Sequence, residues 1–486
     1  MSVAPPPPIS HNPIKRIGSE ALLQRRIGTF PPGPVSYSAS RTMAMVRDPL
    51  SVLLPAYREF GPVFTIRVLN IRNVFMLGPE ANHFLLVSDA ERFRWRDGSM
   101  ADLIPLLGDG MLTIDGEYHR RARRIMLPMF HRDRVGATVE TMLEETHHAM
   151  AGLHAGRELD LERWTRDLAL RIAMRALFGL DPDRANRDID VGREFERALH
   201  FYSVDYLIQV GRGPGTPFGR MIAARKRIDR VLYAEIARRR SERSAGDDIL
   251  TLLMEARDED DGTPLTDREI RDQVMTLLFA GHDTTTSTIG FLFTELARHP
   301  HELARLQDEQ DRVLGGSDPT PAQLAAGDLP LLEQAIDETL RMYPAAWIGP
   351  RRCVEGFDMA GVHVPAGAPV NYCSWASHML PDVFAEPEAF VPDRFSPENK
   401  AMIPKGAYVP FGGGSRTCLG MRFGQMEIRV IASLLLQRMR FELQPEWKLV
   451  IRMTPTLGPR GGLPVVVRER ALPPSLSRSP AVPATA

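Results

Sequence analysis

A glycine-rich loop that carries a single cysteine and leads into an amphipathic helix constrains this chain more than any other feature. The segment FGGGSRTCLGMRFGQMEIRV begins at Phe411, and its fixed positions are Phe411, Gly414, Arg416, Cys418 and Gly420. Five specified positions would match by chance on the order of 10⁻⁴ times in a chain of this length. The glycines permit a tight loop and a close approach of the backbone to a flat ligand.

The position of Cys418 suits an ionised sulfur. It lies just before the helix that we expect over 420–438, and the free N–H groups at a helix N-terminus favour an anion such as a thiolate. Arg416 adds positive charge or binds a carboxylate. A lone cysteine is more often a small, inert, buried side chain, and this is how we interpret Cys353 and Cys373.

Length, charge and cysteine content exclude some classes of function. The 486 residues, 43% of them hydrophobic, suffice for one large core or for two to three ordinary domains. A net charge of −1 gives no indication of nucleic-acid binding. Three cysteines indicate a reducing compartment rather than a disulfide framework. Because the chain has neither a long apolar run nor a signal-peptide pattern, we expect a cytoplasmic protein without a transmembrane anchor; peripheral membrane contact stays open.

Helical periodicity dominates the chain, and strand patterns are few. Apolar residues recur every three to four positions over 137–154, 218–243, 268–297, 300–314, 331–342 and 420–438. Alternating, β-branched stretches predict a hairpin over 63–69 and 73–78 and short strands over 357–367 and 463–467. Without a repeating βα pattern, these elements predict a mainly α fold with a small β region.

We expect one large domain between two loose ends. Residues 1–28 are Pro-rich and then basic, and we expect a flexible N-terminal segment there. Residues 469–486 are rich in Pro, Ser and Ala, and we expect a disordered tail. No stretch within 29–468 is rich enough in Gly, Ser or Pro to divide it.

The cysteine loop resembles the haem-binding loop of the cytochrome P450 family. The resemblance implies that Cys418 is the axial thiolate ligand of haem b, with Phe411 packed beside it and Arg416 at a haem propionate. Gly414 and Gly420 match the glycines of the same motif. The family motifs occur in the expected order over roughly 30–468, and the resemblance therefore also implies the cytochrome P450 fold.

A second motif, FAGHDTTTSTIGF, resembles the oxygen-binding helix of the family. It contains Ala280, Gly281, Asp283 and Thr284. Small residues let a helix lie against the haem face, and a mid-helix Thr hydroxyl bonds back to the i−4 carbonyl. An acid next to an alcohol supplies a proton relay. The resemblance implies that Asp283 and Thr284 are the catalytic pair; taken alone, the motif equally suits an ordinary helix.

A third group of residues resembles the structural charge cluster of the family. Glu338 and Arg341 are spaced i, i+3 on a predicted helix, which by itself indicates little more than a weak surface ion pair. Arg394 lies in FVPDRF, which resembles the Pro-x-Arg-Phe segment of the family. The resemblance implies that these three side chains form a buried cluster behind the haem.

A fourth group is expected at the haem propionates. In DGEYHRRARR, His119 and Arg123 are one turn apart on one helical face. His119 stands where many family members have Trp. Arg351 also occupies a family propionate position, although the adjacent Arg352 makes that choice ambiguous. For a chain rich in Arg, simple surface charge is the alternative.

By resemblance, the substrate pocket is apolar. Its expected residues are Leu103, Leu107, Phe279, Ala280, Trp347, Ile348 and Leu457. Such a lining suits a hydrophobic substrate, namely a lipid, steroid, terpenoid or polyketide. The stretch 201–219 contains Gly and Pro in a predicted lid connection.

The resemblance implies a monooxygenase that uses O₂ and electrons from a separate partner, because no flavin or iron–sulfur motif occurs in the chain. The simplest partner is a ferredoxin with its reductase. Basic residues near the cysteine loop could receive an acidic partner: Arg120, Arg121, Arg124 and Arg422. Two alternatives are a peroxide-driven or rearranging member of the same fold and a non-catalytic haem or ligand-binding protein.

Overall fold

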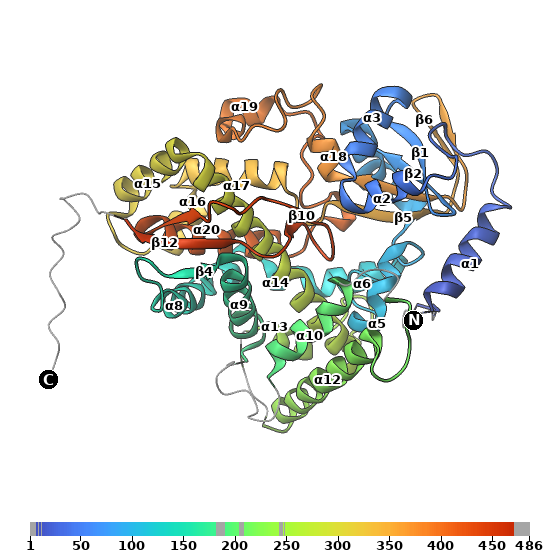
Figure 1. The fold of residues 1–486 in the computed structure, drawn as a ribbon. Coiled ribbons are helices and arrows are strands. Elements are labelled where there is room, and N and C mark those ends of the chain that lie inside the picture. The colour runs from blue at the N-terminus through green and yellow to red at the C-terminus, as the bar shows by residue number, and fades with distance from the viewer. Residues whose placement is uncertain are drawn as a thin grey trace, which may run out of the picture.

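The computed structural model describes residues 6–7, 9–10, 12–180, 190–203, 209–242, 246 and 248–470. A large helical body lies beside a smaller region of β-sheet, to which the first three helices are also packed (Figure 1). The predicted mainly α fold with a small β region is therefore confirmed.

The helices agree closely with the periodicity of the sequence. The predictions for 300–314 and 331–342 correspond to α15 and α17, and the stretch predicted over 137–154 corresponds to α8, which follows the short α7. The principal helices are α1 Pro13–Gln24, α2 Ala39–Arg47, α3 Leu50–Phe60, α4 Pro79–His83, α5 Ile104–Leu107, α6 Gly116–Met126, α7 Arg132–Ala137, α8 Val139–Met150, α9 Leu161–Ile172, α10 Val191–Ser203, α12 Pro217–Glu242, α13 Ile249–Glu255, α14 Asp267–Arg298, α15 Pro300–Leu314, α16 Pro321–Ala326, α17 Pro330–Met342, α18 Ser374–His378, α19 Pro397–Met402 and α20 Met421–Arg438.

The largest sheet has five strands in the order β1-β2-β8-β5-β3. The predicted hairpin forms as an antiparallel pair of β1 and β2, and β6 with β7 forms a second hairpin. A three-stranded sheet has the order β4-β12-β9, and β10 pairs with β11. The strands are β1 Val63–Val68, β2 Ile71–Met76, β3 Phe93–Arg94, β4 Glu158–Asp160, β5 Ile348–Cys353, β6 Phe357–Met359, β7 Val362–Val364, β8 Pro369–Cys373, β9 Met439–Leu443, β10 Ile451–Arg452, β11 Gly458–Pro459 and β12 Pro464–Glu469.

Helix α14 is the axis of the helical body. It packs against α5, α9, α12, α15, α17 and α20. A capping box between Thr266 and Glu269 starts the helix, because each side chain accepts the other residue's backbone N–H. Helices that are apolar on one stripe lie at a surface, whereas α14 is buried on nearly all faces.

The N-terminal segment differs from the prediction. Residues 13–24 form α1 rather than a flexible stretch, with Asn12 as N-cap. Gln24 is buried: its side-chain amide donates to the Arg72 carbonyl, and its side-chain oxygen accepts the Arg72 N–H. Tertiary contacts thus order a segment whose composition alone suggests disorder.

At the other end, β12 extends to Glu469, so the first residue of the predicted tail is ordered. Residues 471–486 of that tail, and 204–208 of the predicted lid, lie outside the described residues. In the part of the chain that the structure describes, every helix is too short or too polar to cross a bilayer.

Candidate haem site and its surroundings

The cysteine loop folds back on itself before α20. The Cys418 N–H donates to the Phe411 carbonyl, with an N···O distance of 2.9 Å. Gly414 has a φ of 59°, and a Cβ there would lie 2.1 Å from the carbonyl oxygen of Leu86. Glycine is therefore required at this position both by the backbone conformation and by the close packing. Gly420 is the residue that immediately precedes the helix.

Cys418 does not pack into the core, although protein surrounds it. Its side chain is accessible, whereas Cys353 and Cys373 are buried. Desolvation by surrounding protein nevertheless raises the pKa of the Cys418 thiol, while a hydrogen bond from the Gly420 backbone and the charge of Arg123 lower it. A sulfur that is accessible and yet surrounded by protein suits a ligand to an enclosed cofactor.

Four basic side chains gather near the loop. They are His119 and Arg123 of α6, Arg351 of β5 and Arg416 of the loop itself. Burial lowers the pKa of Arg416 to about 10, and the nearby charges of Arg351 and Arg123 add to this effect, whereas Asp115 opposes it. Burial and the charges of Arg416 and Arg123 lower the pKa of His119 to about 3, so it is neutral.

The cluster carries more positive than negative charge. Among the described residues, Asp115 is the only carboxylate paired with any of its three arginines, through Arg416 at 2.5 Å. Three guanidinium groups against one carboxylate leave a surplus of two positive charges, and buried charge of one sign is costly unless it is paired. The two propionates of haem would neutralise that surplus. The residues present therefore fit the cofactor.

The two adjacent arginines of β5 point to opposite faces, as alternate residues of a strand do. Arg351 is 3% exposed and its guanidinium lies 3.6 Å from the ring centroid of Trp95, whose own buried Nε1 has no hydrogen-bond partner among the described residues. Arg352 instead pairs with Glu20 of α1 at 2.5 Å. The geometry thus favours Arg351 over Arg352 as the residue directed to the site.

Helix α14 has a partly exposed patch, which we call the opening, at the predicted oxygen-binding motif. From Ile270 to Leu296, every residue is buried except Ala280, Gly281 and Thr284. These three lie on one face of the helix, at i, i+1 and i+4. The Thr284 Oγ1 donates to the Ala280 carbonyl at 2.6 Å, as expected from the sequence.

Asp283 and Thr284 have separate partners. The Asp283 carboxylate lies 3.2 Å from Arg166 of α9 and 3.9 Å from Arg452 of β10, and it accepts a short hydrogen bond from Thr456. Burial raises the pKa of Asp283, but Arg166 and Arg452, together with His282 and the Thr456 hydrogen bond, lower it overall. Arg166, Arg452 and Thr456 escape sequence analysis, because nothing in their local sequence distinguishes them from surface residues.

Glu338 and Arg341 form a fully buried pair, which the half-buried Arg394 joins. Arg341 donates to both carboxylate oxygens of Glu338, at 2.7 and 2.9 Å, and Arg394 Nε lies 3.2 Å from the same carboxylate. Arg341 also donates to the carbonyls of His378 and Ala389. The cluster thus joins α17 to the segment before α19.

The expected pocket residues come from α14, from α5 and the turn before it, from around the start of β5, and from the segment that leads into β11. Leu107, Phe279 and Leu457 belong to the main core, and Leu103, Trp347 and Ile348 pack against it half-buried, as Ala280 lies half-buried on α14. The Leu457 N–H donates to the Ala345 carbonyl at 3.1 Å, which holds the turn before β11 against the start of β5.

The basic surface expected for a redox partner is smaller than predicted. Arg121 is buried and pairs with Asp258 and Glu269 at 2.8 Å, and Arg124 pairs with Asp258 and Asp260. Arg120 is engaged by Glu91 and Glu117. These side chains are neutralised within the chain, which leaves Arg422, an exposed residue in the first turn of α20.

Comparisons with known proteins agree with this geometry. The cytochrome P450 family model matches residues 31–460. The cyclooctat-9-en-7-ol 5-monooxygenase of Streptomyces melanosporofaciens is 32% identical over 413 residues, which cover 83% of this chain and 87% of that protein. The putative cytochrome P450 135B1 of Mycobacterium tuberculosis is 32% identical over 453 residues, 89% of this chain and 90% of that one. The structure of retinoic acid-bound cyanobacterial CYP120A1 superposes with a TM-score of 0.79 at 28% identity, over 91% of this chain and 99% of that one. This chain therefore belongs to the cytochrome P450 family.

Proposed function

We propose that this monooxygenase inserts one oxygen atom from O₂ into a hydrophobic small molecule, with haem b as its cofactor. The observation that carries the proposal is the accessibility of Cys418 inside the molecule, together with the opening that Ala280, Gly281 and Thr284 make in the otherwise buried α14. Helix α14 packs against α20, which begins three residues after Cys418.

Each residue of the site has a stated task in this proposal. A thiolate-ligated haem favours cleavage of the O–O bond, which is the chemistry that the cofactor supplies. Cys418 holds the iron, and Arg123, Arg351 and Arg416 hold the propionates, with His119 as a neutral hydrogen-bonding neighbour. Thr284 and Asp283 hold and transfer protons at the opening in α14. Glu338, Arg341 and Arg394 maintain the scaffold.

The substrate in this proposal is a lipid, steroid, terpenoid or polyketide. The expected pocket residues are aliphatic or aromatic, so burial of apolar surface would supply most of the binding energy. One relative is named a monooxygenase of cyclooctat-9-en-7-ol, and one structural neighbour contains retinoic acid. Both names favour a terpenoid as the first compound class to test.

Electrons in this proposal come from a ferredoxin and its reductase in the cytoplasm. Arg422 is the side chain to test, since it is exposed at the start of the helix that follows Cys418. Changing Arg422 to Glu should slow reduction by an acidic ferredoxin at low salt and have little effect at high salt, because salt screens exposed charges. An unchanged rate at low salt would remove Arg422 from the docking surface.

The absorption spectrum of the reduced carbon-monoxide complex tests the central assignment. Wild type should show the long-wavelength Soret band of a thiolate-ligated haem, and C418H should show the shorter-wavelength band of an imidazole-ligated one. C353A is the matched control, because Cys353 is buried away from the site and hydrogen-bonds the Glu355 carbonyl. A short-wavelength band in wild type would refute the proposal.

A further inference from the structure

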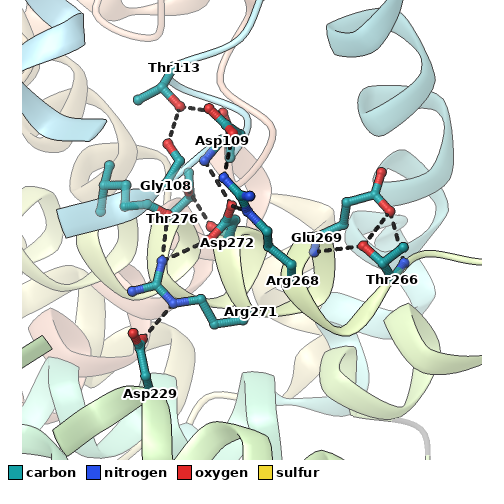
Figure 2. A network of polar contacts seen from close by, with 12 residues as sticks. Gly108, Asp109, Thr113, Asp229, Thr266, Arg268, Glu269, Arg271, Asp272 and Thr276 are labelled. Atoms are coloured by element: carbon teal, nitrogen blue, oxygen red, sulfur yellow. Dashed lines mark hydrogen bonds and ion pairs between the residues drawn. The ribbon is translucent and has the colours of Figure 1, made fainter. Parts of the chain in front are cut away.

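Arg271 is among the largest fully buried side chains of the protein, yet no family motif accounts for it. It lies near the start of α14 and is 1% exposed. Its guanidinium lies 2.6 Å from Asp229 of α12 and 2.8 Å from the neighbouring Asp272. Figure 2 shows the side chain between Asp229 and the turn at Gly108. A buried guanidinium is costly unless its donors are all engaged, so its remaining contacts matter.

Those remaining contacts fix the end of α5. Arg271 donates to the carbonyls of Leu106 and Leu107, at 3.2 and 3.0 Å. Arg225 of α12 donates to the carbonyl of Pro105 at 2.7 Å. The last carbonyls of a helix have no partner within the helix, and here two arginines satisfy three of them.

The turn after α5 is held just as closely. The Asp109 N–H donates to the Asp272 carboxylate at 2.9 Å, and the Met111 N–H donates to the Gln273 side chain at 3.1 Å. Gly108 approaches so near that a Cβ on it would lie 2.2 Å from an Asp272 oxygen. Consecutive side chains of α14 therefore hold the backbone from α5 to Met111. Figure 2 shows Arg271 and Asp272 beside Gly108 and Asp109.

We propose that Arg271 is a positioning residue of the substrate pocket: it locks the wall formed by residues 104–110 onto α14 and α12. The inference rests on the proposed function, which places Leu107 of this wall, and Leu103 just before it, in the pocket. Through Asp229, the position of this wall depends on α12. The wall therefore limits how large a hydrophobic ligand fits above the haem, and Arg271 determines that limit without touching the ligand.

Two variants loosen the lock by different routes. R271K keeps the charge but loses the planar fork that reaches Asp229 and two carbonyls at once. D229N leaves Arg271 in place and removes the charge of its partner on α12. D229E keeps a carboxylate at that position. The matched control is D267N, because Asp267 pairs with Arg240 at 2.6 Å and so also joins α14 to α12, but at an exposed place away from the wall.

The affinities of the holoenzyme for two haem ligands, measured by absorption titration, report whether the wall is held in place. Imidazole is the smaller of the two, and in the proposed pocket only the phenyl group of 4-phenylimidazole would be large enough to contact the wall. In R271K and D229N, the affinity for 4-phenylimidazole should fall about tenfold and the affinity for imidazole less than about twofold. The reason is that a disordered wall must become ordered when the larger ligand binds. D229E should recover most of the affinity, and D267N should match wild type.

Amide hydrogen exchange of peptides covering 104–111 provides a second readout that does not depend on haem. Exchange should accelerate in R271K and D229N and stay unchanged in D267N. Once Arg271 no longer holds the Leu106 and Leu107 carbonyls, the turn can move away from Asp272 and Gln273, which accept the Asp109 and Met111 N–H groups. Equal weakening of both ligands, or unchanged exchange in R271K and D229N, would overturn the inference. If wild type instead lacks the thiolate-type spectrum, the proposed function fails while the exchange result still decides whether Arg271 locks the wall.

Discussion

Asp283 is held by side chains that come from three other parts of the chain. Arg166 lies on α9, Arg452 on β10 and Thr456 in the turn before β11, and all three contact one carboxylate. A carboxylate with two cations beside it is ionised, as its lowered pKa indicates. To pass a proton toward Thr284, the carboxylate would first have to take one up from water, and it would have to give up one of these contacts to do so.

We therefore predict that D283N separates catalysis from folding. Asn keeps the size of the side chain but cannot carry the proton, so the rate of product formation should fall about a hundredfold, within the range for a lost acid–base group. The reduced carbon-monoxide spectrum should not change. D337N is the control, since Asp337 is also buried and paired, with Lys400 at 2.6 Å, but on α17. Equal loss in both variants would show that Asp283 has only a structural role.

His378 makes the stability of the protein depend on pH. Its Nδ1–H donates to the Arg341 carbonyl and its Nε2 accepts the Val409 N–H, so both nitrogens of the neutral ring are engaged. Burial lowers the pKa of His378 to about 3. Between pH 6.5 and that value, the unfolded chain binds a proton that the folded protein excludes. The free energy of unfolding therefore decreases as the pH falls through this window.

The variant H378Q tests this dependence. It should be less stable than wild type at pH 7, but its stability should fall less on acidification, because Gln binds no proton. The difference between the two free energies of unfolding should shrink by on the order of 2 kcal/mol from pH 7 to pH 5. Urea unfolding at both values measures it, and a constant difference would contradict the assignment.

At the scale of elements, the main feature is how closely the turn after α5 approaches α14. Gly108 has a φ of 78°, and Gly110 is so close that a Cβ on it would lie 1.9 Å from Thr276 Oγ1. Most turns are surrounded by solvent, but this turn is surrounded on one side by side chains of α14. Any added atom on this side must push the two elements apart, since packed interiors hold few voids.

We predict that G108A is destabilised by more than its backbone conformation explains. Gly361 has a φ of 75° with no atom near its missing Cβ, so G361A measures the conformational cost alone. G108A adds the collision with Asp272 and should be less stable than G361A by about 1–3 kcal/mol, the usual cost of overpacking. Thermal or urea unfolding of both variants makes the comparison, and equal losses would mean that the turn moves away freely.

At the scale of the whole molecule, the Glu338 cluster joins distant parts of the fold. Glu338 and Arg341 lie on α17, Arg394 lies in the segment before α19, and Glu338 also accepts the Val391 N–H at 2.9 Å. Glu338 and Arg341 are 0% exposed. A paired buried charge adds little net stability, but losing its partner leaves it uncompensated.

We therefore expect E338Q to lower the free energy of unfolding by about 3–5 kcal/mol, because the Arg341 guanidinium keeps its charge without a partner. E442Q is the control: Glu442 pairs with Arg468 at 2.9 Å across β9 and β12, but both side chains are exposed. Its loss should stay below about 1 kcal/mol. Urea unfolding distinguishes the two, and a small loss in E338Q would mean that solvent reaches the cluster.

Local patterns predict most elements of this fold, and tertiary contacts supply the rest. Periodicity with a Pro at the start and a Gly after the end predicts 300–314, and α15 spans those residues. The close spacing of the motif residues around Cys418 also identifies its loop from the sequence. By contrast, α1 is missed because Pro-rich composition masks a helix that Gln24 anchors on Arg72. The pairing of Arg121 with Asp258 is missed because the chain has 60 Lys and Arg residues, and sequence alone does not tell which are engaged.

The two unpaired positive charges beside the cysteine loop have a consequence for cofactor choice. Arg351 and Arg416 are largely enclosed and Arg123 is half-buried. Among the described residues, Asp115 is the only carboxylate that pairs with any of the three, through Arg416. A porphyrin whose two carboxylic acids are esterified has the same ring and the same iron, but it would leave these guanidinium groups desolvated and unneutralised. We therefore expect the protein to select porphyrins by the charge of their carboxylates as well as by shape, and to bind the free diacid more tightly than its ester.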